Sequence, residues 1–396
     1  MAPAGKRNRI MNRSRILRAI WQQPMRSRVE IAALLGLDKS TVSGIVNKLV
    51  EVGLVQEVAE GDASRQGGRR PVQLQIDPTF GCVLGLELQP GLFRASLCNM
   101  HGTVLKSWAE ERWRGDMSFS DYVLGIIRDL LADVGEQCSS IMGIGVAMGG
   151  LVNSIRNEIA GSIPMGIAEY DFQREISEKL EIPVIAENDA NACAWGELTF
   201  HRTRNVHDFL YVLVQMRTSE PGRHLYGGIG VGIGVVINGT LYPGANFTAG
   251  EFRSALYDGQ GTGQFSLTDE EAARVATDPA MRERFFRELA RNVAVIINVM
   301  NLDHLFIGGD ILAYHGEIES VFNEEIQRNW PYESPVQCEI GLSLFGENSV
   351  VYGAAGMVLE RVFSDQIFPL GDIRNRHGRA EVLSDFNETV MGLGER

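Results

Sequence analysis

The first part of the chain holds three stretches in which apolar residues recur every three or four positions, the spacing of an amphipathic helix. The first covers residues 13–22 and ends before Pro24, the second follows Ser27 as its N-cap, and the third follows a turn at Gly36. The residues that we expect on the inner sides of the second and third helices are Val29, Ile31, Ala32, Leu34, Leu35, Val42, Ile45, Val46, Leu49 and Val50. This order is typical of a helix-turn-helix.

Two strand-like stretches follow, at residues 54–58 and 71–76, around a tip rich in glycine and arginine, and they predict a β-hairpin wing. The polar side of the third helix and the wing tip are candidate DNA contacts, because hydroxyl and amide groups reach base edges while basic groups contact phosphates. The candidates are Lys39, Ser40, Thr41, Ser43, Asn47, Lys48, Arg65, Arg69 and Arg70. The alternative is a three-helix module that docks another protein.

From residue 81 onward, short apolar strands alternate with helical stretches, which predicts an α/β fold. Turns are expected at Pro90-Gly91 and His101-Gly102, and a buried strand over residues 141–152 contains the pair Gly149-Gly150. The other expected elements are helices at residues 120–135, 172–180, 192–200 and 288–302, and strands at residues 182–186, 209–214, 227–237 and 305–309.

Charge separates the two parts of the chain. Residues 1–80 contain 13 Lys and Arg against 7 Asp and Glu, although the whole chain has a net charge of -13. A basic module joined to an acidic body indicates a nucleic-acid reader whose remaining surface avoids phosphates. The apolar runs are too short and too rich in glycine to span a membrane. The five cysteines show no disulfide or metal spacing, so we expect a reducing, cytoplasmic location.

The stretch Glu187-Asn188-Asp189-Ala190-Asn191 carries the strongest candidate chemistry. A carboxylate and two amides at the end of a buried strand suit a ligand with many hydroxyl groups, since amides donate and accept while Asp189 accepts or removes a proton. The alternative is that these side chains only cap the next helix. A glycine-rich strand at residues 227–237 also suits close approach to a ligand, although such glycines often serve packing alone.

Five motifs in order give the chain a resemblance to a known family. They are Glu-Asn-Asp-Ala-Asn-Ala, a glycine-rich strand with Ile-Asn-Gly, Tyr-Pro-Gly-Ala-Asn, Ala-Gly-Glu, and a late helix leading into Phe-Ile-Gly-Gly. Together with the winged helix-turn-helix they resemble the ROK family of repressors and sugar kinases. The resemblance implies an actin-like, two-lobed ATPase fold with a sugar between the lobes. We therefore expect a DNA-binding domain at residues 1–80 and a sugar-sensing domain of two α/β lobes at residues 81–396.

The resemblance also implies ligand-binding residues, with Asp189 at the position of the kinases' catalytic base. These residues are Gly149, Gly150, Asn188, Asp189, Asn246, Glu251 and Ser254. Three departures from the family's pattern matter, and the last is the insert at residues 217–226, where the family normally turns tightly. The phosphate-binding hairpin of the kinases is replaced by Glu87-Leu88-Gln89-Pro90-Gly91, and Pro90 has no N–H to donate. The zinc histidine is replaced by Ser254, and residues 252–278 contain neither Cys nor His. We expect no zinc and no other cofactor.

The sequence therefore predicts a transcriptional regulator of the repressor type, without enzyme activity, that binds operator DNA as a homodimer or homotetramer. A sugar or sugar derivative between the lobes would control it. Two alternatives remain open at this stage. The first is an ATP-dependent sugar kinase with Asp189 as the base, and the second is a DNA-bound protein whose sugar pocket is vestigial. The insert at residues 217–226 is expected to be a tolerated surface loop or a local lid.

Overall fold

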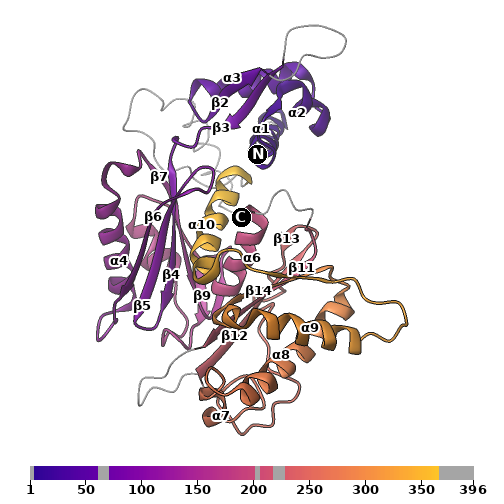
Figure 1. Cartoon of the computed structure of the whole chain (residues 1–396). Coiled ribbons are helices and arrows are strands. Elements are labelled where there is room, and N and C mark those ends of the chain that lie inside the picture. Colours follow the sequence, from indigo (N-terminus) through magenta and orange to yellow (C-terminus); the bar gives the residue numbers. More distant parts are fainter. Residues whose placement is uncertain (1–3, 61–70, 201–205, 217–227, 365–396) are drawn as a thin grey trace.

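The computed structural model describes residues 4–60, 71–200, 206–216 and 228–364, and it shows a small N-terminal head above two α/β lobes (Figure 1). The wing tip with Arg65, Arg69 and Arg70, the insert at residues 217–226 and the C-terminal tail lie outside the described residues. In the described part, no helix is both long enough and apolar enough to cross a membrane.

The head (residues 4–76) is a winged helix-turn-helix. Its elements are α1 (Ala4–Gln22), β1 (Arg26–Ser27), α2 (Arg28–Leu35), α3 (Lys39–Glu51), β2 (Val55–Glu60) and β3 (Val72–Ile76). The wing predicted from the sequence is confirmed as the antiparallel pair β2 and β3, and the two-residue strand β1 adds to its edge in the order β1-β3-β2.

Local signals explain where the head helices begin and end. Ser27 caps α2 in a capping box with Glu30, and Gly36 ends it with a φ of 63°, in the left-handed region that favours glycine. The expected inner face of α2 is partly wrong, because Val29 and Leu34 are 51% and 48% exposed. With only eight residues, α2 buries a narrow stripe centred on Ile31.

The first lobe is built on a five-stranded sheet in the order β10-β7-β4-β5-β6. The strands β4, β5 and β6 form an antiparallel meander, and β7 and β10 continue the sheet in parallel with β4. The elements are β4 (Cys82–Gln89), β5 (Leu92–Asn99), β6 (Val104–Glu111), α4 (Phe119–Val134), β7 (Ile141–Met148), β8 (Leu151–Asn153), β9 (Glu158–Gly161), α5 (Phe172–Glu175) and β10 (Val184–Asn188).

The second lobe repeats this topology, with a five-stranded sheet in the order β13-β12-β11-β14-β15. Again the first three strands along the chain are antiparallel, and two parallel strands follow on the other side. The elements are β11 (Phe209–Met216), β12 (Ile229–Ile237), β13 (Thr240–Leu241), α7 (Asp269–Ala273), α8 (Pro279–Met300), β14 (His304–Gly309), α9 (His315–Arg328) and β15 (Glu339–Leu342).

Two helices, α6 (Asp189–Phe200) and α10 (Ser349–Ser364), lie between the two sheets (Figure 1). Their backbones come close because Gly353 faces α6, where a Cβ would overlap the carbonyl oxygen of Ala192. On the other side of α10, Gly85 and Gly145 of the first sheet meet its backbone in the same way. At these three glycines, backbone therefore packs directly against backbone, with no side chain in between.

The end of α10 contacts the head. Arg18 of α1 forms an ion pair with Glu360 at 2.7 Å, and the rings of Trp21 and Phe363 lie 4.6 Å apart. Both aromatic side chains are buried in an apolar cluster that also contains residues of the first lobe, such as Met142. The head and the first lobe thus share one hydrophobic core.

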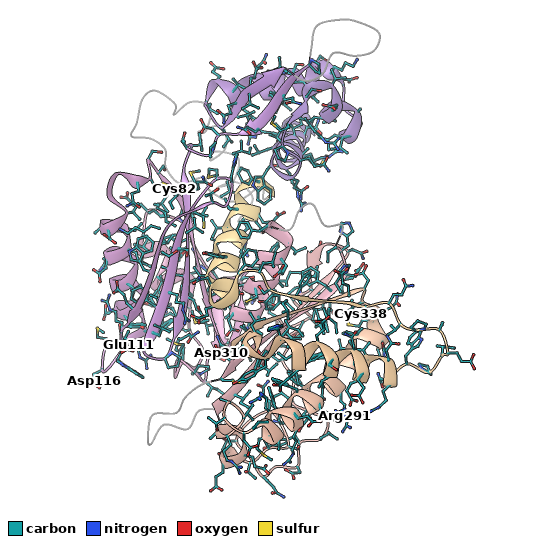
Figure 2. All side chains as sticks on the ribbon, viewed as in Figure 1. Cys82, Glu111, Asp116, Arg291, Asp310 and Cys338 are labelled. Atoms are coloured by element: carbon teal, nitrogen blue, oxygen red, sulfur yellow. A yellow bond between two sulfur atoms is a disulfide. The ribbon has the colours of Figure 1, made fainter. Side chains whose placement is uncertain are left out.

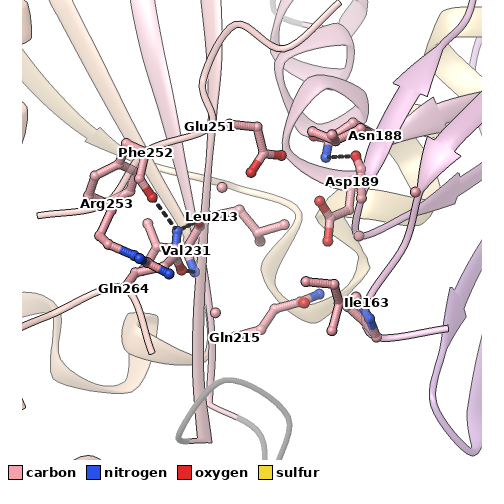
Figure 3. A pocket seen from close by; sticks show the side chains of 17 residues that line it. Ile163, Asn188, Asp189, Leu213, Gln215, Val231, Glu251, Phe252, Arg253 and Gln264 are labelled. Atoms are coloured by element: carbon pink, nitrogen blue, oxygen red, sulfur yellow. Dashed lines mark hydrogen bonds between the residues drawn. The ribbon is translucent and has the colours of Figure 1, made fainter. Parts of the chain in front are cut away.

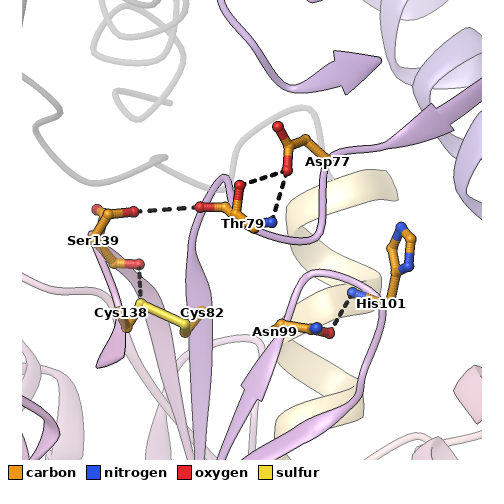
Figure 4. Close-up of a disulfide and its surroundings, with 8 residues drawn as sticks. Asp77, Thr79, Cys82, Asn99, His101, Cys138 and Ser139 are labelled. Atoms are coloured by element: carbon orange, nitrogen blue, oxygen red, sulfur yellow. Dashed lines mark hydrogen bonds between the residues drawn. A yellow bond between two sulfur atoms is a disulfide. The ribbon is translucent and has the colours of Figure 1, made fainter. Parts of the chain in front are cut away.

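One cysteine expectation is wrong. Cys82 and Cys138 form a disulfide with a Cα–Cα distance of 6.1 Å at the junction between the head and the first lobe (Figures 2 and 4). The two cysteines are 56 residues apart, so their spacing in the sequence did not indicate a disulfide. The parallel pairing of β4 with β7 brings the starts of both strands, and with them the two cysteines, close together in the fold. Nearby, Ser139 donates a hydrogen bond to the carbonyl oxygen of Thr79, which fastens the connection to the head.

Candidate functional site

A cavity of about 360 Å³ lies between the lobes and is shown in Figure 3. This volume is within the range of small-molecule sites in proteins. Its lining comes from both lobes and from the start of α6, and consists of Gly149, Gly150, Leu151, Gly161, Ile163, Pro164, Asn188, Asp189, Leu213, Gln215, Gly230, Val231, Gly232, Glu251, Phe252, Arg253 and Gln264. Five of the seven ligand-binding candidates from the sequence are therefore at one cavity: Gly149, Gly150, Asn188, Asp189 and Glu251.

Asn188 and Asp189, at the junction of β10 and α6, both accept a hydrogen bond from the N–H of Ala190 and both line the cavity. The side-chain oxygen of Asn188 accepts hydrogen bonds from the N–H groups of Ala190 and Asn191, at 2.9 and 3.1 Å. Asn188 therefore caps the helix, as one alternative expected, but it does not only cap, because it also lines the cavity. Asp189 is the first residue of α6, is only 7% exposed, and faces the cavity.

The glycine pair of the first lobe forms the turn between β7 and β8, on the wall next to Asn188. The side-chain nitrogen of Asn188 donates to the carbonyl oxygen of Gly150 at 2.9 Å, and Ser162 donates to the carbonyl oxygen of Gly149 at 2.5 Å. Gly150 has a φ of 138°, and a Cβ there would lie 2.5 Å from the carbonyl oxygen of Gly161. Only glycine lets this turn form so close to the β9 backbone.

Glycines of the second lobe position the opposite wall. Gly250 has a φ of 89°, and a Cβ on it would overlap the carbonyl oxygen of Ile233, so the turn that presents Glu251 requires glycine. On β12, a Cβ on Gly232 would lie 2.9 Å from the Cβ of Ala190. The glycine-rich strand therefore allows the start of α6 to approach β12 and also lines the cavity with backbone.

Three carboxyl groups make this region acidic. Burial and the neighbouring Asp189 raise the pKa of Glu251. Glu87, in the β4–β5 hairpin, is 2% exposed, and burial raises its pKa to about 7, although Gln89 donates a hydrogen bond to it at 2.5 Å and Arg94 lies 3.6 Å away. The negative charge of Asp189 also raises the pKa of Glu87, by a smaller amount than burial does.

Two candidates do not reach the cavity. Asn246 is exposed in the loop after β13 and does not line it. Ser254 is buried, and its hydroxyl oxygen accepts hydrogen bonds from the side chain of Asn292 at 3.0 Å and from the N–H of Leu256 at 3.1 Å. Ser254, expected to bind the ligand, is instead a structural residue of the second lobe. Its hydroxyl group is hydrogen-bonded to Asn292 of α8.

The DNA-contact candidates of α3 lie on one exposed side of the head. Lys39, Ser40, Asn47 and Lys48 are exposed, whereas Thr41 and Ser43 are half-buried. Arg28, at the start of α2, donates to the side-chain oxygen of Asn47 at 3.1 Å and pairs with Glu57 of the wing at 2.6 Å. Sequence reasoning missed Arg28, because its role depends on the packing of three elements.

Comparison with known proteins finds two family matches in different parts of the chain. Residues 93–259 match the model of the ROK family, and residues 11–66 match that of the MarR family. Over residues 93–259, the chain is similar to the ROK family. Its head is MarR-like, in agreement with the winged helix-turn-helix.

Individual relatives agree with this similarity. The xylose repressor of Bacillus subtilis (strain 168) is 29% identical over 63% of this chain and 62% of its own length. The chain thus spans about three fifths of the length of that curated relative. The xylose repressor of Lactiplantibacillus pentosus is 24% identical over 89% of this chain and 95% of its own length. A crystal structure of a ROK family transcriptional regulator, a homologue of the E. coli MLC protein, has a TM-score of 0.72 at 20% identity and covers 90% of this chain and 97% of its own. This last likeness shows the fold.

The zinc that the ROK resemblance implies does not fit the loop after Glu251. Within the described ranges, no group of three or more His, Cys, Asp or Glu side chains is arranged to hold a metal ion. Hydrogen bonds hold the loop instead. Gln264 donates to the carbonyl oxygens of Val231 and Phe252 at 2.8 and 3.0 Å and accepts from the N–H of Val231 at 2.8 Å.

We therefore expect Gln264→Ala to lower the free energy of unfolding by about 2 kcal/mol, because it leaves partly buried backbone groups of Val231 and Phe252 unpaired. A metal chelator is expected to leave the melting temperature of the wild-type protein unchanged. Thermal melts of both proteins with and without chelator measure both effects. A chelator-induced drop in the wild type would contradict the absence of zinc.

The cavity also contains residues that the sequence did not point to. Gln215, Arg253 and Gln264 line it, but each lies in a segment without a recognisable motif. The Arg253 guanidinium stacks on the ring of Tyr257 at 4.3 Å. The signal that could have found Gln215 is its position at the end of a buried strand, where α/β proteins place ligands.

Proposed function

We propose that this chain is a transcriptional repressor whose binding to operator DNA is controlled by a sugar or sugar derivative in the interlobe cavity. The observation that carries the proposal is the pairing, in one chain, of a winged helix-turn-helix with a cavity whose opposite walls present Asp189 and Glu251. Carboxylates accept strong hydrogen bonds from hydroxyl groups, which suits a ligand with several of them. The names of the relatives support the repressor role.

The contacts between cavity and head supply a route for control. Asp189 begins α6, Gly353 packs α10 closely against α6, and the end of α10 holds the head through the pairs described above. A ligand that favours one arrangement of the lobes would shift α6 and α10 and with them the head. In a homodimer or homotetramer this would change the spacing of two heads, which must match half-sites a whole number of DNA turns apart. Such a regulator would act in the cytoplasm.

The kinase alternative has one observation in its favour, the cavity position of Asp189, where a catalytic base would lie. The β4–β5 hairpin opposes it. Pro90 offers no N–H to a phosphate, and the side chain of Glu87 is buried and bonded to Gln89 instead of facing a nucleotide. We therefore propose a protein without kinase activity.

A thermal-shift screen of the full chain tests the proposal, using monosaccharides, disaccharides and sugar phosphates with and without ATP and Mg²⁺. We expect one sugar class to raise the melting temperature and ATP with Mg²⁺ to have no effect, because only a ligand that binds the folded state stabilises it. Stabilisation by ATP followed by sugar phosphorylation would favour the kinase. No shift with any sugar would indicate a vestigial cavity.

A further inference from the structure

Gly44 occupies an unusual place in the middle of α3. It is exposed, and a Cβ built on it would have no atom within 4 Å. Helical spacing puts it on the same side of α3 as Ser40 and Asn47, two of the candidate DNA contacts. The contacts within the protein therefore give no reason for a glycine at this position.

Glycine in a helix has a cost. Relative to alanine it destabilises the interior of a helix by roughly 0.5–1 kcal/mol, because it loses more backbone freedom on folding. The conformation of Gly44 does not require glycine, since it lies inside a regular helix and is not among the residues with positive φ. Gly353 of α10, by contrast, is explained by its contact with Ala192.

Asn47, which lies on the same side of α3 as Gly44, is held by a hydrogen bond. Because Arg28 donates to the side-chain oxygen of Asn47, the amide nitrogen of Asn47 is left as the group that can donate outward. Arg28 is itself anchored by Glu57 of the wing. Gly44 thus forms a gap in the side-chain surface of α3 beside an oriented donor.

We propose that Gly44 is a specificity-determining DNA contact, at which the backbone of α3 comes closest to the base edges of the major groove. This inference rests on the proposed DNA-binding function. A helix with its side chains nearly fills the major groove, so a position without a Cβ lets the helix axis lie deeper there. A side chain at residue 44 holds the helix outward and weakens the contacts of Ser40 and Asn47 with the bases.

The test begins with a duplex that the wild-type protein selects from a random 30-base-pair DNA library, since a probe of roughly three helical turns accommodates two half-sites. Binding to this duplex and to a scrambled duplex is then measured for the wild type, Gly44→Ala and Gly316→Ala. Gly316 is the matched control, because it is exposed in the first turn of α9 and a Cβ on it would also meet no atom within 4 Å.

We expect Gly44→Ala to raise the melting temperature slightly, to lower affinity for the selected duplex at least about tenfold, and to leave affinity for the scrambled duplex unchanged. Gly316→Ala is expected to keep wild-type DNA binding. Unchanged affinity of Gly44→Ala for the selected duplex would overturn the role of Gly44. If the wild-type protein selects no sequence at all, the proposed regulator function itself fails.

Discussion

We expect Asp189→Ala to abolish the effect of the sugar on DNA binding and to leave DNA binding itself unchanged. Asp189 is nearly buried and faces the cavity, whereas every candidate DNA contact lies in the head. Hydrogen bonds to a charged group contribute roughly 1.5–3 kcal/mol each. Loss of two of them from a sugar would weaken its binding by a hundredfold or more.

The measurement is a titration of sugar into a complex of the protein with its selected DNA duplex, followed by fluorescence anisotropy. Asp121→Ala serves as the control, because Asp121 is also an acidic residue in the first turn of a helix but is exposed and does not line the cavity. It should respond to sugar as the wild type does. Loss of DNA binding in Asp189→Ala would contradict the separation of sensing from DNA recognition.

Glu87→Gln is expected to stabilise the protein by about 3 kcal/mol at pH 8 and to have almost no effect near pH 4.5. The pKa of Glu87 is about 7 in the folded protein, against 4.5 for an unperturbed glutamate. Between these values the unfolded chain loses the proton of Glu87 while the folded chain keeps it, so folding becomes less favourable as the pH rises. Each pKa unit corresponds to about 1.4 kcal/mol.

Glutamine keeps the shape of Glu87 and still accepts the hydrogen bond from Gln89, but it has no charge to bury. Urea unfolding at pH 4.5 and at pH 8 measures the difference between the two proteins. Glu110→Gln, on the exposed strand β6 of the same sheet, is the matched control and should change stability little at either pH. Equal stability of Glu87→Gln and the wild type at pH 8 would show that burial does not raise the pKa of Glu87.

Local signals in the sequence were enough to predict the elements of the head and most of the candidate residues at the cavity. The cap at Ser27 and the turn at Gly36 are determined by neighbouring residues, so α2 was placed correctly. Asp189 and Glu251 could be predicted because each follows a buried strand or a glycine turn, where ligand-binding residues of α/β proteins gather. The MarR-like and ROK matches cover the same two parts of the chain.

The remaining features depend on contacts between distant segments. The helix α10 was not predicted, and its role appears only when Gly353 meets α6 and Phe363 meets Trp21. The disulfide escaped notice because strand pairing, not spacing, brings its cysteines together. Ser254 has the right distance from Glu251 in sequence, but the loop turns its side chain toward Asn292. Short motifs do not contain this information.

The shared core of α1 and α10 has a consequence for how the protein is made. Trp21 is synthesised early, whereas Phe363, which covers it, follows roughly 340 residues later, on the order of tens of seconds at ordinary ribosome speeds. During that time the apolar side of the head has no native partner. A prematurely terminated chain therefore carries a head with an uncovered apolar surface, which makes it a target for chaperones and proteases.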